Sequence, residues 1–234
     1  MKDLLEPLIY PHNLVLLGLL LACIGYRKKG LWLLLIFYYL AGNSFIANQV
    51  RSAYSAAIAN SAMAQGSQLL VLGCGGSATA LPACAKARLS EAVTRLDGPA
   101  ALLISTEYCQ PYVDYLLGIS QQVVVDCFNG GSNTYQEFAT IKAKGLTPDY
   151  ILSSDYHAWR VQQLVRFHGL PSKVLASSSQ TFRPVNCSYN CFFTVNLSNF
   201  DLYSKLMAEF SSYAVFVLTR DWTTWYSAAE QGNS

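Results

Sequence analysis

The sequence is poor in charged residues. Only 13% of its 234 residues are Asp, Glu, Lys or Arg, about half of the roughly 25% that is usual in soluble proteins. There is no polybasic run and no acidic tail, and the formal net charge is +2. We therefore expect no nucleic-acid partner, because clustered positive charge is what binds such partners.

Motifs for metals and nucleotide cofactors are missing as well. No C-x2-C pair occurs, and the three histidines are not grouped with the cysteines, so we predict no metal site. The glycine-rich segment at residues 73–76 has neither the full G-x-G-x-x-G spacing nor the lysine of a P-loop. The sequence thus supports neither dinucleotide-cofactor binding nor P-loop NTPase chemistry, and the cofactor is left open.

Hydrophobic residues make up 52% of the chain and are densest in its first fifty residues. From Pro7 to Tyr26 no acidic or basic residue occurs other than His12, and a second apolar run extends from Leu31 to Val50. Each run has about twenty residues, which is long enough to cross ~30 Å of hydrocarbon. We predict a transmembrane hairpin over residues 1–51, with helices at about 7–26 and 31–50.

Three basic residues, Arg27, Lys28 and Lys29, lie between the two runs. A short basic loop stays in the cytoplasm, so both ends of the hairpin would face outward. A signal peptide followed by a buried element is the alternative, but its charges would precede the first run rather than follow it. We expect a membrane protein, bound to membrane lipid, whose soluble domain lies outside the cytoplasm.

The cysteines fit an outward-facing domain. Cys23 lies in the first apolar run, and an even number of cysteines follows it, which is compatible with disulfides. The Cys187/Cys191 pair is the simplest local bridge, and six free buried thiols are the alternative. The six cysteines are Cys74, Cys84, Cys109, Cys127, Cys187 and Cys191.

After a small, polar connector at residues 52–66, the pattern predicts one α/β domain over residues 67–234. Short apolar runs that alternate with helical spacing indicate a mostly parallel sheet with helices on both faces, a Rossmann-like three-layer domain. Strands are expected at residues 69–72, 100–104, 123–125, 150–152 and 173–176, with a candidate sixth at 192–195. Helices are expected at residues 83–96, 112–117, 135–144, 158–168 and 199–216.

Ligands of open parallel sheets bind beyond the carboxyl ends of the strands, and polar or glycine-rich segments follow each predicted strand. Glycines let the backbone approach a ligand, helix N-termini favour anions, and histidine can exchange protons near neutral pH. Taken singly, these residues could equally form tight turns and helix caps. The candidate ligand-binding residues are Gly73, Gly75, Gly76, Ser105, Asn133, Thr134, Ser154 and Arg160. The candidate catalytic residues are His157, Glu107 and Asp126.

Four segments carry a family resemblance. They are VLGCGG at 71–76, RLSEA at 88–92, NTYQEF at 133–138 and SDYHAWR at 154–160. In these segments the chain resembles a divergent, ElyC-like member of the bacterial envelope family of unknown-function domains that includes ElyC, SanA and YdcF. It departs from the family at Ser105-Thr106-Glu107, where an S-G-G turn is usual.

The resemblance implies a bacterial inner-membrane protein whose soluble domain faces the periplasm. It also implies a role in cell-envelope biogenesis, around peptidoglycan or its polyprenyl-phosphate lipid carrier. The expected ligand is a phosphorylated lipid carrier or another small anion, and envelope enzymes are expected partners. If the protein is an enzyme, it would be a hydrolase or transferase of a phosphorylated precursor. A non-catalytic scaffold, which the altered Ser105-Thr106-Glu107 loop favours, and a binder of nucleotides or S-adenosylmethionine are the alternatives.

Overall fold

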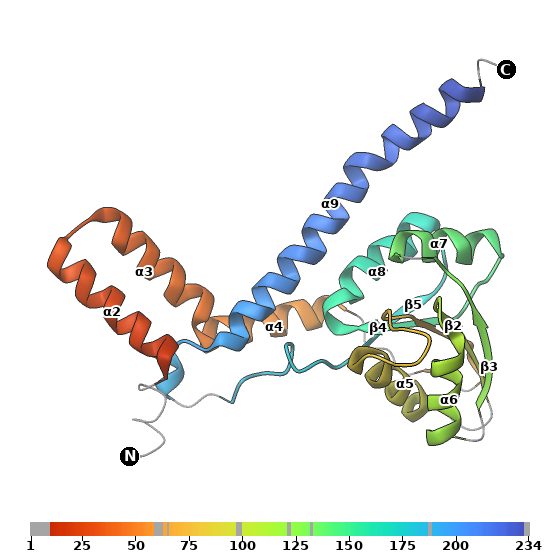
Figure 1. Ribbon diagram of the computed structural model, residues 1–234, viewed down its shortest axis with the longest axis horizontal. Helices are drawn as coiled ribbons and strands as arrows, with labels where there is room; N and C mark the ends of the chain where they lie inside the picture. The colour runs from red at the N-terminus through yellow and green to blue at the C-terminus, as the bar shows by residue number, and fades with distance from the viewer. Residues whose placement is uncertain are drawn as a thin grey trace. The chain divides into compact units, whose positions relative to one another are not determined.

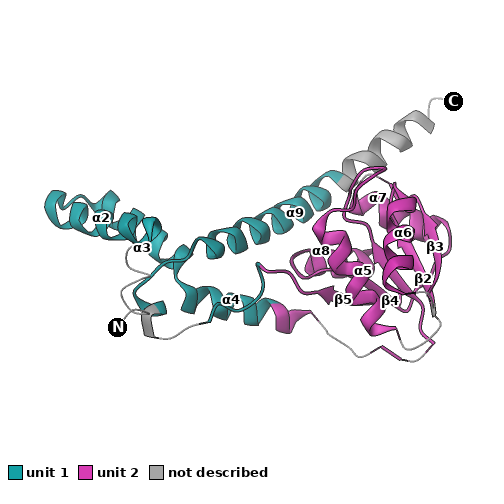
Figure 2. Cartoon of the chain, turned by 60° about the horizontal axis from the view of Figure 1, so that its bottom comes forward, with its two compact units in different colours: residues 1–54, 181–234 teal, residues 55–180 magenta. Residues whose placement is uncertain are grey.

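The chain forms two compact units in the computed structural model, coloured separately in Figure 2. The sheet unit comprises residues 55–180, and the helical unit comprises residues 1–54 and 181–234. The structure describes residues 10–58, 63–64, 66–96, 100–120, 123–131, 133–186 and 189–231, with the backbone alone for residues 100, 189–190 and 220–231.

A five-stranded parallel sheet lies at the centre of the sheet unit, in the order β3-β2-β1-β4-β5 (Figure 1). β1 is the middle strand and pairs with β2 on one side and with β4 on the other. The winding therefore reverses between β1 and β4, which is the switch point where such sheets open a crevice. The strands are β1 Leu69–Leu72, β2 Ala100–Ser105, β3 Val123–Phe128, β4 Tyr150–Ser154 and β5 Lys173–Ser177.

Helices cover both faces of this sheet (Figure 1). α5 and α6 pack on one face, and α7 and α8 cover the other. The predicted Rossmann-like three-layer α/β fold is confirmed for the sheet unit. The helices are α5 Ala83–Arg95, α6 Cys109–Ile119, α7 Thr134–Ala143 and α8 Asp155–His168.

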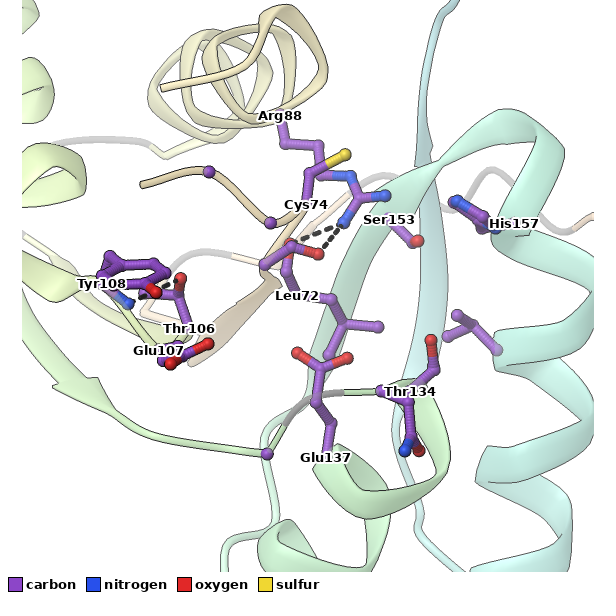
Figure 3. Close-up of a pocket in the computed structure, with 16 residues that line it drawn as sticks. Leu72, Cys74, Arg88, Thr106, Glu107, Tyr108, Thr134, Glu137, Ser153 and His157 are labelled. Carbon is purple, nitrogen blue, oxygen red and sulfur yellow. Dashed lines mark hydrogen bonds between the residues drawn. The ribbon is translucent and has the colours of Figure 1, made fainter. Parts of the chain in front are cut away.

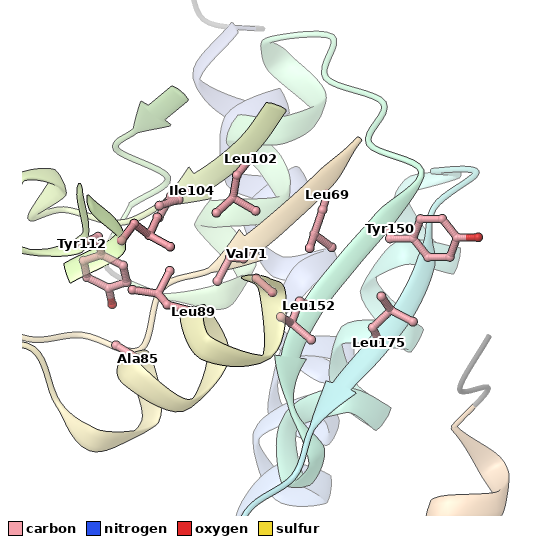
Figure 4. Packing of buried hydrophobic residues seen from close by; sticks show 12 residues of the cluster. Leu69, Val71, Ala85, Leu89, Leu102, Ile104, Tyr112, Tyr150, Leu152 and Leu175 are labelled. Carbon is pink, nitrogen blue, oxygen red and sulfur yellow. The ribbon is translucent and has the colours of Figure 1, made fainter. Parts of the chain in front are cut away.

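The core forms because β1 is apolar on both sides. All four of its residues are buried, and successive side chains of a strand point to opposite faces. Leu69 and Val71 join Leu89 of α5 in one cluster with residues of β2, β4 and α6 (Figure 4). Each fully buried leucine contributes about 1.5–3 kcal/mol relative to an exposed one, so burial on both faces fixes β1 in the middle of the sheet.

β3 extends three residues and β4 two residues beyond their predicted ends. β4 continues through two buried serines, Ser153 and Ser154, and α8 begins at once with Asp155. The predicted loop between this strand and its helix is therefore wrong, and His157 lies in the first turn of α8. Ser154 is accommodated in the sheet because its Oγ accepts a hydrogen bond from Arg88 Nε at 3.0 Å.

The candidate sixth strand at residues 192–195 is wrong. Its first residue ends η2, the 3-10 helix Tyr189–Phe192, and Phe193 is exposed. Only Val195 pairs with another segment, through an isolated antiparallel bridge to Asn43. Apolar composition alone suggested a strand here, but the segment belongs to the helical unit.

The helical unit contains α2 (Pro11–Tyr26), α3 (Lys29–Gly42), α9 (Leu197–Gln231) and α4 (Ser44–Ala57) as far as Tyr54. α2 and α3 lie side by side as a hairpin (Figure 1), and residues 7–9 of the first predicted helix lie outside the described residues. α4 extends into the predicted connector at 52–66. None of the helices, as far as they are described, combines the length and the apolar character needed to cross a bilayer.

Asn43 divides the second predicted membrane helix into α3 and α4. Its extended backbone ends α3, and its Oδ1 accepts a hydrogen bond from Ile46 N at 3.1 Å, as an N-cap of α4 does. Its Nδ2 donates to the carbonyl of Cys191 at 2.9 Å. A continuous helix over residues 31–50 is therefore wrong, because a buried asparagine here serves a helix end and a distant segment.

Residues 181–196 also belong to the helical unit, so the predicted domain of residues 67–234 is longer than the sheet unit. Polar side chains of α4 hold the start of this segment in the helical unit. Arg51 is 2% exposed and donates from Nε to the carbonyl of Thr181 at 2.9 Å. Asn48 Nδ2 donates to the carbonyl of Val185, also at 2.9 Å.

Two disulfides lie in the sheet unit, Cys74–Cys84 and Cys109–Cys127. Disulfide formation is thus confirmed, and the alternative of six free thiols is wrong. Cys23 is free and buried in α2. The predicted Cys187/Cys191 pair cannot be described, since Cys187 lies outside the described residues.

Candidate functional site

A pocket of about 400 Å³ opens at the carboxyl ends of the central strands of the sheet unit (Figure 3). Its walls come from the turn after β1, the loop after β2, the start of α7, and the junction of β4 with α8. It therefore occupies the β1/β4 switch point, where open α/β sheets bind their ligands. Its volume falls within the roughly 300–1,000 Å³ of small-molecule sites.

The turn after β1, residues 73–76, forms the backbone wall of the pocket. Gly75 and Gly76 have φ values of +70° and +124°, which residues with a side chain rarely adopt. Neither glycine donates its backbone N–H to a hydrogen bond within the described part of the chain. Such N–H groups in a glycine turn suit an anion.

The Tyr112 hydroxyl and a disulfide hold this turn in place. The Tyr112 hydroxyl accepts a hydrogen bond from Cys74 N and donates one to the carbonyl of Gly75, each at 3.0 Å. The Cys74–Cys84 disulfide joins the turn to the first turn of α5. A turn fixed in advance loses little entropy when a ligand binds.

Arg88 extends from α5 into the wall of the pocket, toward the end of β1 (Figure 3). It is 2% exposed, and its Nη1 donates to the carbonyls of Leu72 and Gly73, both at 2.7 Å. With Nε bound to Ser154, the guanidinium links the ends of β1 and β4 across the switch point. It therefore brings a fixed positive charge to the pocket.

Glu137 of α7 is the buried carboxyl of the site, 8% exposed. The Ser105 Oγ donates a hydrogen bond to Glu137 Oε1 at 2.9 Å. Burial raises the pKa of Glu137 above its usual value, and the Ser105 hydrogen bond and the charge of Arg88 only partly oppose this. A carboxyl that holds its proton to a higher pH than usual can serve as an acid or as a hydrogen-bond donor.

The starts of two helices complete the walls. Thr134 is the first residue of α7, and its neighbour Asn133 accepts a hydrogen bond from Gln136 N, as an N-cap. His157 lies in the first turn of α8, where its Nδ1 is 3.1 Å from Arg160 Nη2. Both helix starts offer the positive end of a helix dipole to the pocket.

The structure brings seven of the predicted site residues to one pocket and places two more behind it. Ser105 and Ser154 are buried and hold Glu137 and Arg88. Arg160 does not line the pocket, but its Nη2 lies 3.1 Å from Nδ1 of His157, which does. The seven that line it are Gly73, Gly75, Gly76, Glu107, Asn133, Thr134 and His157.

Asp126 does not lie at the end of its strand as predicted. β3 continues to Phe128, and Asp126 is exposed within it and does not line the pocket. β3 is one of the two edge strands of the sheet, and Asp126 points to the same face as Val124, which is exposed as well. The predicted strand was too short because it covered only the apolar run Val123–Val125.

Arg88 and Glu137 were not predicted as site residues, although the sequence held a signal for each. Arg88 lies on the apolar face of its helix, between Ala85 and Ala92, and Glu137 precedes Ile141 by one helical turn. A charged residue within an apolar helical stripe must be hydrogen-bonded or functional, because an unpaired buried charge is costly. That rule identifies both.

The charged residues around the pocket suit binding and proton transfer more than metal coordination. Arg88, the glycine turn and the helix starts favour an anion, while Glu137, Glu107 and His157 can exchange protons or accept hydrogen bonds. The described residues contain no group of three His, Cys, Asp or Glu placed to hold a metal ion. No protein-family model, no curated protein and no solved structure matches this chain.

Proposed function

We propose that the protein is a membrane-anchored periplasmic factor of cell-envelope biogenesis, and that its pocket binds a phosphate-containing ligand. The observation that supports the ligand is the convergence of three anion-binding features on one pocket. They are the glycine turn after β1, the guanidinium of Arg88 and the starts of α7 and α8. Each favours negative charge, and together they form a preorganised phosphate site.

The α2–α3 hairpin is the proposed membrane anchor. Its large apolar side chains are exposed in the isolated chain, with Leu21 at 61%, Leu33 at 69% and Phe37 at 69%. Monomeric soluble proteins rarely expose so continuous an apolar surface. The basic residues Arg27 and Lys28 lie between the helices and Lys29 begins α3, and in the proposed anchor all three would remain on the cytoplasmic side.

The two disulfides support the periplasmic location of the sheet unit, because disulfides persist in oxidising compartments. The resemblance to the ElyC, SanA and YdcF family points to the same compartment and to a polyprenyl-phosphate carrier as the source of the phosphate. In a hydrolase or transferase, His157 would exchange protons at the phosphate and Glu107 would position the attacking water or hydroxyl.

A ligand screen tests the proposal on the detergent-solubilised full chain. Melting temperatures are compared with a polyprenyl phosphate, inorganic phosphate, nucleotides and S-adenosylmethionine. A ligand at a hundred times its Kd adds about 2.7 kcal/mol to the stability of the folded state. We expect a shift with the polyprenyl phosphate that is lost in His157→Ala and kept in His168→Ala, a matched change at the other end of α8.

No shift with any compound, in a folded sample, would contradict phosphate binding and leave the non-catalytic scaffold as the better account. Membrane insertion has its own test, extraction of the membrane fraction at alkaline pH. The full chain should remain with the lipid. Release of the full chain into the supernatant would contradict the anchor without affecting the pocket.

One observation favours a second function, a binder of nucleotides or S-adenosylmethionine. Glu107 follows the end of β2 and lines the pocket, and Rossmann domains place an acidic residue near this position to bind ribose hydroxyls. A stabilising shift with an adenosine-containing ligand that Glu107→Gln removes would support this function. A shift with polyprenyl phosphate that Glu107→Gln leaves intact would support the first.

A further inference from the structure

A buried carboxyl presents a difficulty for a pocket that binds phosphate. Glu137 lines the same pocket as Arg88 and the glycine turn, and an ionised carboxylate there would repel an anion at close range. The difficulty disappears if the carboxyl is neutral when the ligand is bound. The inference that follows rests on the proposed function and concerns how the same site takes its ligand.

The position of Glu137 is fixed from several sides. The Ser105 Oγ donates to its Oε1, and Gly130 packs against both residues. A Cβ on Gly130 would lie 3.0 Å from Glu137 Cγ and would clash with the Ser105 hydroxyl. The Ser105 hydroxyl engages Oε1, the backbone at Gly73 also acts on the carboxyl, and the carboxyl faces the pocket near Leu72 (Figure 3).

The charged and titratable groups around Glu137 come from three other elements. Arg88 on α5 and Arg160 on α8 both exert a positive potential on it. His157 on α8 and Glu107 after β2 line the same pocket. β1 and β2 contribute only neutral groups nearby, the backbone at Gly73 and the hydroxyl of Ser105.

We propose that Glu137 binds the phosphate group as a neutral carboxylic acid, with Oε1 accepting from Ser105 and a proton on Oε2 donated to a phosphate oxygen. No covalent bond is made or broken in this step. The ligand binds the protonated form of the protein, so each bound phosphate retains one proton on Glu137. Phosphate binding and proton binding at this site are therefore coupled.

Burial supports the coupling because it raises the pKa of Glu137 and favours the protonated form before any ligand arrives. A bound phosphate adds negative charge and favours that form further. As the pH rises above the pKa of the free protein, phosphate affinity should fall by about tenfold per pH unit, the limit for one coupled proton. Removing the Ser105 hydroxyl removes a hydrogen bond that lowers this pKa, so it should move the fall to higher pH.

The test is calorimetric titration of the full chain with inorganic phosphate and with a short-chain polyprenyl phosphate, over a pH series and in buffers of different ionisation enthalpy. Phosphate and histidine also exchange protons, so the difference between wild type and Glu137→Gln isolates Glu137. The amide of glutamine can still accept from Ser105 and donate to phosphate at every pH. Glu91→Gln, a salt-bridged residue of α5 outside the pocket, is the matched control.

We expect both probes to bind wild type and Glu91→Gln more weakly as the pH rises, with a clearly flatter dependence in Glu137→Gln. Ser105→Ala should shift the dependence to higher pH, and it tests the inference if Glu137→Gln does not fold. Equal pH dependence in wild type and Glu137→Gln, or no shift in Ser105→Ala, would overturn the inference and leave phosphate binding intact. Binding of the lipid probe alone would identify the source of the phosphate, and binding of neither would overturn both proposals.

Discussion

Cys74 and Cys84 form a disulfide that joins a wall of the pocket to the first turn of α5. The bridge closes a loop with a sequence separation of 10, which contains both positive-φ glycines of the turn after β1. Cys74 also donates its N–H to Tyr112. The disulfide and the tyrosine therefore hold the same turn from two sides, and the pocket depends on both.

Replacing this disulfide should weaken both folding and ligand binding. We expect Cys74→Ser/Cys84→Ser to lower the free energy of unfolding by about 2–3 kcal/mol, because a closed loop of this size restricts the unfolded chain. Phosphate affinity should fall as well, since the turn is less ordered before binding. Denaturant unfolding and phosphate titration measure the two effects.

The second disulfide provides the comparison for that change. Cys109–Cys127 closes a loop of similar size, with a sequence separation of 18, and neither cysteine lines the pocket. Cys109→Ser/Cys127→Ser should cost a similar free energy of unfolding and leave phosphate affinity much closer to wild type. Equal losses of affinity in the two double variants would argue against a specific role for the turn after β1.

Gly130→Ala should disrupt the Ser105–Glu137 hydrogen bond. The added Cβ has no room between the Ser105 hydroxyl and Glu137 Cγ, so one of the two side chains must move. We expect a loss of about 1–3 kcal/mol in unfolding free energy, typical of overpacking, measured by denaturant unfolding. Gly118→Ala is the control, since a Cβ there meets nothing within 4 Å and should stabilise α6 by about 0.5–1 kcal/mol.

The stability of the protein should depend on pH through Glu137. Its folded-state pKa is raised by burial, so the folded state binds this proton more tightly than the unfolded state does. Its stabilising contribution is complete below the unfolded pKa and is lost as the pH rises through the raised folded pKa. Glu137→Gln should therefore gain stability relative to wild type across that interval, as measured by denaturant unfolding over a pH series without ligand. A constant difference between the two proteins would contradict this pKa shift.

Two substitutions of Asn43 distinguish its role as the N-cap of α4 from its hydrogen bond to the Cys191 carbonyl. Asn43→Leu removes both the cap of α4 and the donor to the Cys191 carbonyl, and we expect it to lower the melting temperature. Asn43→Ser keeps a good N-cap and loses only the donor, so about 0.5–2 kcal/mol of the loss should be recovered. If Asn43→Leu is as stable as wild type, one continuous helix is compatible with the fold.

Several elements of the sheet unit could be predicted from local pattern. Leu69–Leu72 is apolar on both faces and bounded by glycine, so its strand had the predicted bounds. The polar ends of β3 and β4 were missed because Asp126 is exposed at the sheet edge and Ser154 is satisfied by Arg88. Neither condition can be recognised without the tertiary structure.

The sequence predicted where the candidate site lies, but it missed two of its charged residues, Arg88 and Glu137. The glycine turn, Thr134 and His157 follow strands or begin helices, and such positions meet at one edge of a parallel sheet. The strand order decides which of them meet, and no local pattern encodes it. Asn43 could not be recognised as a helix end, because its partner Cys191 is 148 residues away in the sequence.

The most direct test of phosphate binding is calorimetric titration of a polyprenyl phosphate into the detergent-solubilised full chain at one pH near neutrality. We predict saturable binding to wild type and to His168→Ala, and at least about tenfold weaker binding to His157→Ala, which corresponds to about 1.4 kcal/mol. Equal affinity in all three proteins would place the ligand outside this pocket. No binding to a folded wild type would contradict the account.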